Sequence, residues 1–125
     1  MNLFMALQKV ATVHDVKGLE PLLINIEDIA IGIYKFNDEY YAYENICPHQ
    51  GGPVCEGIVS GKAMCEVSPR GSRVREYASD DQMTVVCPWH GVEYDIETGT
   101  CLAFKELQLR SFKVVVDGEN ILVQL

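Results

Sequence analysis

Apolar and polar residues alternate along several short stretches of this chain, as is typical of β-strands whose side chains point to opposite faces. The first half of the chain predicts four such strands, over residues 3–13, 22–26, 29–36 and 40–44. Glu27-Asp28 and Asn37-Asp38-Glu39 separate the last three as tight turns. The aromatic and β-branched residues of these strands are expected to pack across an antiparallel hairpin.

The second half of the chain continues in the same way. It predicts short strands over residues 83–86, 92–95, 107–116 and 121–125. Asp117-Gly118 lies between the last two, and Asp-Gly between apolar runs is a strong hairpin signal. We find no long amphipathic helix, internal repeat or low-complexity tract. The sequence therefore predicts an all-β fold class.

Two short runs carry the candidate chemistry, Cys47-Pro48-His49 and Cys87-Pro88-Trp89-His90. Each offers one thiolate and one imidazole, and each is followed by glycine. Two soft sulfur ligands and two nitrogen ligands of intermediate softness make a metal site. The matched layout predicts two loops that close over one centre, and the glycines let backbone N–H groups approach a bound group closely.

This pattern of Cys-x-His followed by Cys-x-x-His resembles the Rieske iron–sulfur family. The wider match takes in residues 47–53 (CPHQGGP), 87–91 (CPWHG), Tyr94-Asp95 and Thr98-Gly99. Within that family the chain is most similar to the small soluble ferredoxins that serve bacterial ring-hydroxylating oxygenases. The resemblance covers nearly the whole chain, apart from one insertion.

The resemblance implies the Rieske fold, in which an antiparallel β-sandwich base carries a small cluster-binding subdomain with two loops. We expect residues 1–125 to form one such domain, with the subdomain over about residues 45–100. The implied cofactor is a Rieske-type [2Fe–2S] cluster. Cys47 and Cys87 would bind one iron, and His49 and His90 the other, at a tip where the histidines face solvent and give the electron a short exit.

The resemblance also bears on the reduction potential. Two neutral imidazoles in place of two thiolates make reduction easier, and Rieske potentials span roughly −150 to +300 mV. In high-potential relatives a serine after the second His-Gly bonds a bridging sulfide, and a disulfide links the two loops. Here Val92 takes the serine position and no cysteine pair is available, although the tyrosine of those relatives is present as Tyr94. We therefore expect a potential in the lower part of the range.

The gap between His49 and Cys87 holds 37 residues (87 − 49 − 1), often more than twice the length in the soluble ferredoxins. We assign an insertion to about residues 61–83 and expect an exposed excursion, either a turn of helix or an extended hairpin. It contains four of the ten basic residues, balanced by nearby acidic ones. It is either a tolerated surface insertion or an element that selects a partner, and its mixed charge favours the first.

Composition limits the function classes. A net charge of −8 argues against binding to nucleic acid and suits transient docking on basic patches of redox partners. No apolar run approaches the roughly 20 residues that span a bilayer, and the first residues lack a basic region, so neither a membrane anchor nor a signal peptide is expected. Five cysteines are an odd number for a disulfide framework, which favours the reducing cytoplasm.

Three functions are compatible with these features. The first is a one-electron carrier without enzymatic activity, which takes electrons from an NAD(P)H-dependent flavoprotein reductase and passes them to a terminal non-haem iron oxygenase. The second is a Rieske-like small subunit of a larger reductase such as nitrite reductase. The third is a structural zinc module, although zinc fingers place two cysteines before two histidines whereas this chain alternates them. The intact four-residue motif favours the first.

Other conspicuous residues are expected to be structural. Trp89 is predicted to pack in the core, and His14 to lie on the surface, far from both loops in sequence. The tyrosines at positions 40, 41 and 43 are expected to pack the hairpin, and Cys65 to have no role in the site.

Overall fold

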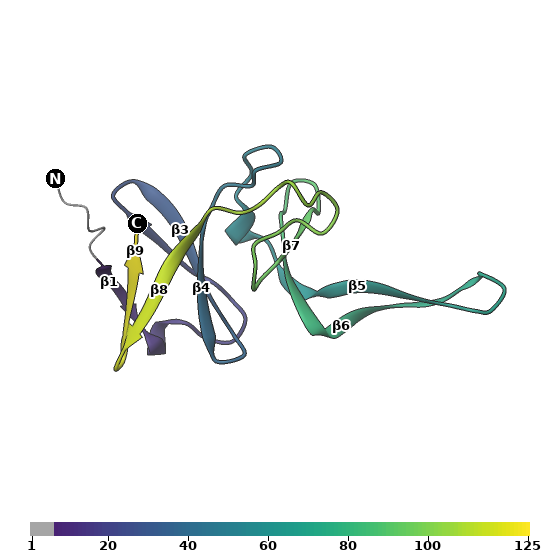
Figure 1. The fold of residues 1–125 in the computed structure, drawn as a ribbon, viewed down its shortest axis with the longest axis horizontal. Helices are drawn as coiled ribbons and strands as arrows, with labels where there is room; N and C mark the ends of the chain where they lie inside the picture. Colours follow the sequence, from purple (N-terminus) through teal and green to yellow (C-terminus); the bar gives the residue numbers. More distant parts are fainter. Residues whose placement is uncertain (1–6) are drawn as a thin grey trace.

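The computed structural model describes residues 7–125 as a β-base, a loop region above it and a long hairpin that projects to one side (Figure 1). The base is a six-stranded antiparallel sheet in the order β1-β9-β8-β4-β3-β2. Its strands are β1 (Leu7–Thr12), β2 (Leu22–Ile26), β3 (Ile29–Phe36), β4 (Glu39–Glu44), β8 (Ser111–Asp117) and β9 (Asn120–Gln124).

The hairpin turns of the base need left-handed backbone conformations. Glu27 and Asp28 have φ of 50° and 69°, and Asn37 and Asp38 have φ of 51° and 64°. Two successive residues with positive φ match the right-handed twist of the flanking strands. Short acidic and amide side chains tolerate this region better than most, which explains why these pairs end the strands.

The base consists of two three-stranded blocks, β2-β3-β4 and β1-β9-β8, joined only where β4 pairs with β8 over two residues. Side chains from both blocks form one hydrophobic core: Ala11, Val16, Ile26, Ile31, Ile33, Ala42, Phe112, Ile121 and Val123. Because the core draws on both blocks, the predicted sandwich-like antiparallel base is confirmed.

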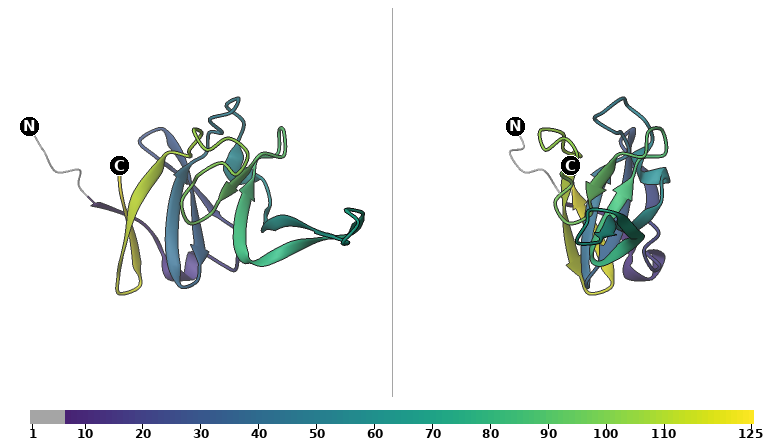
Figure 2. Two further views of the ribbon diagram at one scale, coloured as in Figure 1. Left: turned by 45° about the vertical axis from the view of Figure 1, so that its right-hand side comes forward. Right: turned by 90° about the vertical axis from the view of Figure 1, so that its right-hand side faces the viewer.

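A second, smaller sheet lies next to the loop region, and its β5–β6 hairpin is the part that projects (Figure 1). Its strands β5 (Val59–Val67), β6 (Arg73–Val86) and β7 (Glu93–Asp95) run in the order β5-β6-β7. We call residues 62–79, at the far end of the β5–β6 hairpin, the arm. The left view of Figure 2 shows the arm extending away from the body, and in the right view the arm points toward the viewer. Of the two structures expected for residues 61–83, the extended hairpin is therefore the one observed.

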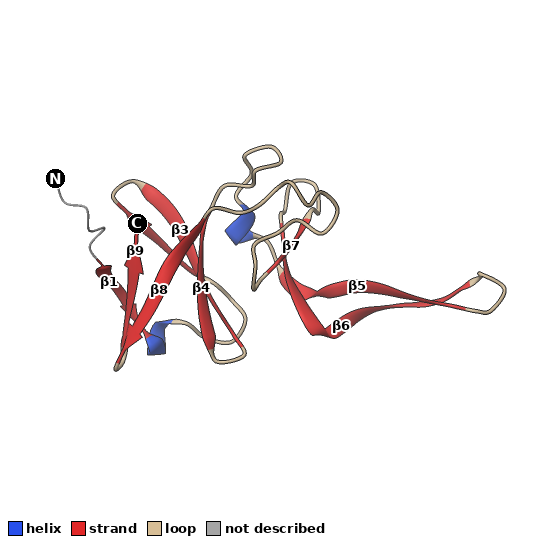
Figure 3. Ribbon diagram, in the orientation of Figure 1, coloured by secondary structure: helices blue, strands red, loops and turns tan. Residues whose placement is uncertain are grey.

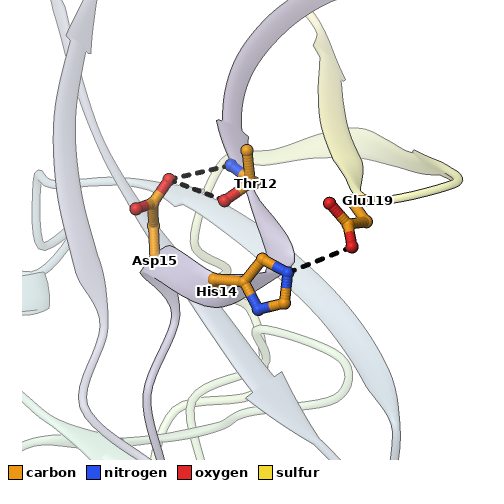
Figure 4. Close-up of polar contacts among 4 residues, drawn as sticks. All are labelled: Thr12, His14, Asp15 and Glu119. Carbon is orange, nitrogen blue, oxygen red and sulfur yellow. Dashed lines mark hydrogen bonds and ion pairs between the residues drawn. The ribbon is translucent and has the colours of Figure 1, made fainter.

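Polar contacts close the end of the base around β1 and the β8–β9 turn (Figure 4). The short 3₁₀ turn η1 (Val13–Asp15) follows β1, and its Asp15 carboxylate accepts hydrogen bonds from the Thr12 N–H (2.9 Å) and hydroxyl (3.2 Å). The hydrogen bond from the Thr12 backbone lowers the pKa of Asp15. His14 Nε2 lies 3.3 Å from Glu119 Oε1 with both side chains exposed, so the prediction of a surface histidine is confirmed.

The all-β prediction is confirmed, because the only helical segments among residues 7–125 are η1 and η2 (Val54–Glu56), each one short turn (Figure 3). Residues 3–6 of the first predicted strand lie outside the described residues. The strand predicted to begin at residue 107 begins at Ser111, because buried Leu109 and half-buried Leu107 pack in the core below the loops instead. No helix in the described part of the chain is long and apolar enough to cross a membrane.

Candidate metal centre

The first loop leaves β4 and turns back on itself within five residues. The Cys47 carbonyl accepts a hydrogen bond from the Gly51 N–H (2.6 Å), and the Cys47 N–H donates to the Gly52 carbonyl (2.7 Å). Gly51 has φ of +79°, a conformation that strongly favours glycine. This closure buries Cys47, which is 2% exposed, while the loop tip stays at the surface.

The second loop repeats this hydrogen-bond arrangement residue for residue. The Cys87 carbonyl accepts from the Gly91 N–H four residues on, and the Cys87 N–H donates to the Val92 carbonyl five residues on, both at 2.9 Å. Gly91 also has a positive φ, +69°. The expectation of two matched loops is therefore confirmed in the backbone itself, even though the loops are 40 residues apart (87 − 47).

Donors converge on the Cys47 sulfur. Burial raises the pKa of this thiol, but hydrogen bonds from the Tyr94 hydroxyl, the backbone N–H groups of His49 and Gln50, and the Cys87 side chain together lower it below its ordinary value. The Tyr94 oxygen lies 3.1 Å from Cys47 Sγ. Cys47 is thus prepared to carry negative charge, as a thiolate ligand must.

Cys87 occupies the equivalent position and is 1% exposed. The backbone N–H groups of Trp89 and His90 favour its thiolate, but burial and the neighbouring Cys47 sulfur raise its pKa above the ordinary value. Without a bound cation, a thiolate at Cys47 therefore makes a second thiolate at Cys87 unfavourable. A group that brings positive charge between them would remove this conflict.

The two imidazoles meet beside the sulfurs. The His49 and His90 rings are 5.2 Å apart between centroids, at an interplanar angle of 83°. His49 Nδ1 is buried without a hydrogen-bond partner, whereas His90 is exposed. A buried imidazole nitrogen with no partner is costly unless it binds a ligand, so Nδ1 of His49 is suited to metal coordination.

No three His, Cys, Asp or Glu side chains within residues 7–125 are placed to hold one metal ion together. A tetrahedral zinc site needs four ligands around one point. A Rieske cluster takes two cysteines on one iron and two histidines on the other, and the loops offer two buried thiols in contact with each other and two imidazoles whose ring centroids are 5.2 Å apart.

Trp89 corrects a prediction made from the sequence. It does not pack in the core but is 57% exposed at the second loop. Its ring lies over the first loop, where a Cβ added to Gly52 would come within 2.7 Å of it. The indole therefore covers the backbone of the opposite loop, and Gly52 is required because any side chain would displace the ring.

Two further residues support the site and were not identified from the sequence. The Phe104 ring stacks on His49 with centroids 6.1 Å apart and planes inclined by only 4°. The Asn45 side chain accepts a hydrogen bond from the Cys55 N–H (2.8 Å) and donates to Glu56 (3.0 Å), which braces the first loop. Phe104 could have been noticed as the one aromatic residue between Thr98-Gly99 and Phe112.

The tyrosines of β4 and Cys65 lie where the sequence predicts them. Tyr43 is buried and donates a hydrogen bond to the Ile96 carbonyl (2.7 Å), while Tyr40 and Tyr41 are partly buried on the same strand. The tyrosines therefore pack the hairpin, as expected. Cys65 is exposed on β5 in the projecting hairpin and contributes nothing to the loops.

Tyr94→Phe is expected to lower the reduction potential by about 50 mV, because the Tyr94 hydroxyl stabilises negative charge on the Cys47 sulfur and this charge grows on reduction. Protein-film voltammetry of the iron-loaded variant measures the shift. Tyr41→Phe is the matched control, since the Tyr41 hydroxyl donates to Glu39 and not to a loop residue, and its loss should leave the potential unchanged. Equal potentials for Tyr94→Phe and the unmodified protein would contradict the assigned role.

Comparison with known proteins identifies the family. The family model of the Rieske [2Fe-2S] domain matches residues 6–113. The ferredoxin component of the p-cumate 2,3-dioxygenase system from Pseudomonas putida is 33% identical over 97 residues, covering 77% of this chain and 65% of that protein. Mouse apoptosis-inducing factor 3 is 32% identical over 118 residues, which are 91% of this chain but only 16% of that much longer protein.

The fold is shared with solved structures as well. A protein described as the small subunit of an NADH-dependent nitrite reductase from Mycobacterium tuberculosis superposes with a TM-score of 0.71. It covers 96% of this chain and 95% of its own at 14% identity, a likeness that shows the fold alone. Because the family model spans both loops and most of the base, the chain belongs to the Rieske [2Fe-2S] domain family.

Proposed function

We propose that this protein is a cytoplasmic one-electron carrier whose Cys47, His49, Cys87 and His90 hold a Rieske [2Fe–2S] cluster. It accepts electrons from an NAD(P)H-dependent flavoprotein reductase and donates them to a terminal non-haem iron oxygenase. The proposal is supported most directly by the two matched loops, which bring two buried thiols and two imidazoles together. It is supported also by the similarity to the ferredoxin component of the p-cumate system.

Each side chain has a separate task in this proposal. The two cysteines hold the buried side, where backbone N–H groups already point at their sulfurs. The exposed His90 and the partly exposed His49 hold the outer side. When bound, the cluster takes up one electron and releases it again. The exposed imidazole shortens the path to a docked protein, and the Trp89 indole limits access of water to the first loop.

The surroundings of the histidines suit transient docking. Trp89, Phe104 and Ile46 leave apolar surface exposed beside the loops, with exposed fractions of 57%, 45% and 49%. Small apolar patches of this kind favour short-lived redox complexes. The chain's net charge of −8 adds long-range attraction to a basic partner. The exposed, unpaired Cys65 suits a reducing compartment.

The proposal is tested by electron paramagnetic resonance of the purified protein after dithionite reduction, with iron and acid-labile sulfide measured on the same sample. We expect a rhombic signal of the mixed His/Cys type and two irons and two sulfides per chain. The potential should lie below about +75 mV, the middle of the Rieske range, because Val92 offers no hydroxyl to the cluster. Zinc in place of iron would overturn the cofactor assignment.

Electron transfer is tested separately with the iron-loaded protein. A flavoprotein reductase from a ring-hydroxylating system and NADPH or NADH should reduce the cluster, and a terminal oxygenase should reoxidise it. Stable co-purification with one large reductase, with no exchange of electrons as a free carrier, would instead favour a fixed small subunit of that enzyme.

A further inference from the structure

In the described structure, no other element packs against either face of the arm. Every residue of Ala63–Val67 and Arg73–Ala78 is exposed, including the large apolar side chains of Met64 (36%), Val67 (61%), Val74 (58%) and Tyr77 (40%). A two-stranded ribbon in water is only marginally stable by itself. An arm of this length with apolar residues on its surface is therefore best stabilised by packing against another protein surface.

One edge of the arm is open and regular. β5 is the edge strand of its sheet, and β7 covers only Thr84–Val86 of β6. Both irregularities of the β5–β6 pairing place their extra residues on β6. Ala63 pairs with Ala78 and Gly61 with Met83, and Glu66 pairs with Arg75 and Val67 with Arg73. Bulges disrupt an edge for further pairing, so β5 is the edge that can accept another strand.

Charge is divided between the arm and the body. The arm contains four basic residues and two acidic ones, so its charge is +2, and the rest of the chain carries −8 − 2 = −10. Arg75 pairs with Glu66 and Arg73 with Glu76 within the arm, which leaves the basic charge of Arg70 at its tip.

A groove at the base of the arm carries the opposite charge. It has a volume of about 500 Å³ and lies between the start of β2 and the start of β5. Leu23 and Ile58 expose apolar surface there (49% and 69%), and Glu20 and Glu56 supply negative charge with no basic residue in the lining. The groove thus complements Arg70 at the arm tip in charge.

We propose that two copies of this chain associate through their arms, with the β5 edges paired antiparallel about a two-fold axis. In this arrangement the tip of each arm lies at the base of the other, so Arg70 approaches the acidic groove that Glu20 and Glu56 line on the second copy. The nine residues of β5 span about 26 Å at roughly 3.3 Å per residue, which is enough to place Val67 opposite Val59 when Ala63 lies on the axis. A second copy is the occupant because both complementary surfaces lie on this one chain, as a closed two-fold interface requires.

The first test measures the mass of the iron-loaded protein by sedimentation equilibrium over a range of concentrations. We expect twice the chain mass, falling to one chain mass when residues 62–82 are replaced by Asn-Gly. That replacement joins the Gly61–Met83 pair by a two-residue turn and leaves both loops in place. The absorption spectrum of the cluster shows that the shortened protein is folded. A monomer up to about 1 mM, or a dimer that persists without the arm, would overturn the proposal.

The second test is a charge exchange. Arg70→Glu and Glu20→Arg should each weaken dimerisation about fivefold, because every dimer contains two copies of the contact. The double variant should restore the unmodified affinity. Lys113→Glu changes the net charge by −2, as Arg70→Glu does, but on an exposed position of β8, and it should have little effect on dimerisation. Single variants that weaken the dimer without recovery in the double variant would contradict the tip-to-base arrangement.

The same variants would also show whether the arm binds a different protein. If the protein is monomeric and loss of the arm instead slows electron transfer to an oxygenase, the arm binds another protein and the self-association proposal is wrong. The cluster spectrum separates this outcome from any failure of the cofactor assignment.

Discussion

Cys87→Ala is expected to yield protein that retains less than about a tenth of its iron and acid-labile sulfide. The Cys87 sulfur contacts the Cys47 sulfur between the loops, and both thiols are buried. Because binding of a group to the folded state alone stabilises that state, the thermal midpoint should also fall by about 10 °C. Metal analysis and calorimetry on the same preparation measure both effects.

Cys65→Ala is the matched control, since this cysteine is exposed on β5 of the projecting hairpin, away from both loops. It should keep the iron content and thermal midpoint of the unmodified protein. A Cys87→Ala variant that still binds two irons and two sulfides per chain would show that the ligand set has been assigned wrongly.

Gly57→Ala is expected to destabilise the protein by more than about 3 kcal/mol and to prevent stable cluster binding. A Cβ at this position would overlap the Val86 carbonyl oxygen, and Val86 directly precedes Cys87. The Val86 oxygen is a backbone atom, and the position of the Cβ is fixed by the backbone of residue 57. Neither atom can therefore rotate away as the end of a long side chain could. The 2.9 Å hydrogen bond from the Val86 N–H to the Ile58 carbonyl lies beside the clash and would be lost with it.

Gly118→Ala separates this close approach from the general cost of replacing glycine. Gly118 has φ of +61° in the β8–β9 turn, and an added Cβ would meet nothing within 4 Å. This substitution should lower the free energy of unfolding by only about 1 kcal/mol, because alanine is strained in the left-handed backbone conformation, and it should leave the cluster in place. Denaturant unfolding of the iron-loaded variants compares the two, and similar losses at both positions would contradict the proposed backbone clash.

The sequence determines the base well because its signals are local. The strands Leu22–Ile26 and Ile29–Phe36 agree with their predicted bounds, since each is an apolar stretch that ends at a pair of turn residues. The length of β6 was not apparent, because Arg73–Gln82 is polar and mixed in charge. Its strand conformation comes from pairing with β5, which no local pattern reports.

The four ligand candidates could be identified because cysteine and histidine at this spacing have few other uses in a protein. The positions of Trp89 and Phe104 could not. An aromatic residue is usually buried, and only the meeting of two distant loops explains why Trp89 covers Gly52 and Phe104 stacks on His49. Close approaches such as Gly57 against Val86 are likewise invisible before the two segments are brought together.

The β5–β6 pairing has a consequence for how quickly the site can form. A flexible chain of 37 residues between His49 and Cys87 would have to close a long loop before the ligands met. Here the turn at residues 68–72 can start a hairpin whose successive pairs run back to Val59 and Val85, next to the two loops. Each step closes only a short loop, so contacts distant in sequence form by local zippering. The long segment between the two loops thereby offers a local folding route by which they can meet.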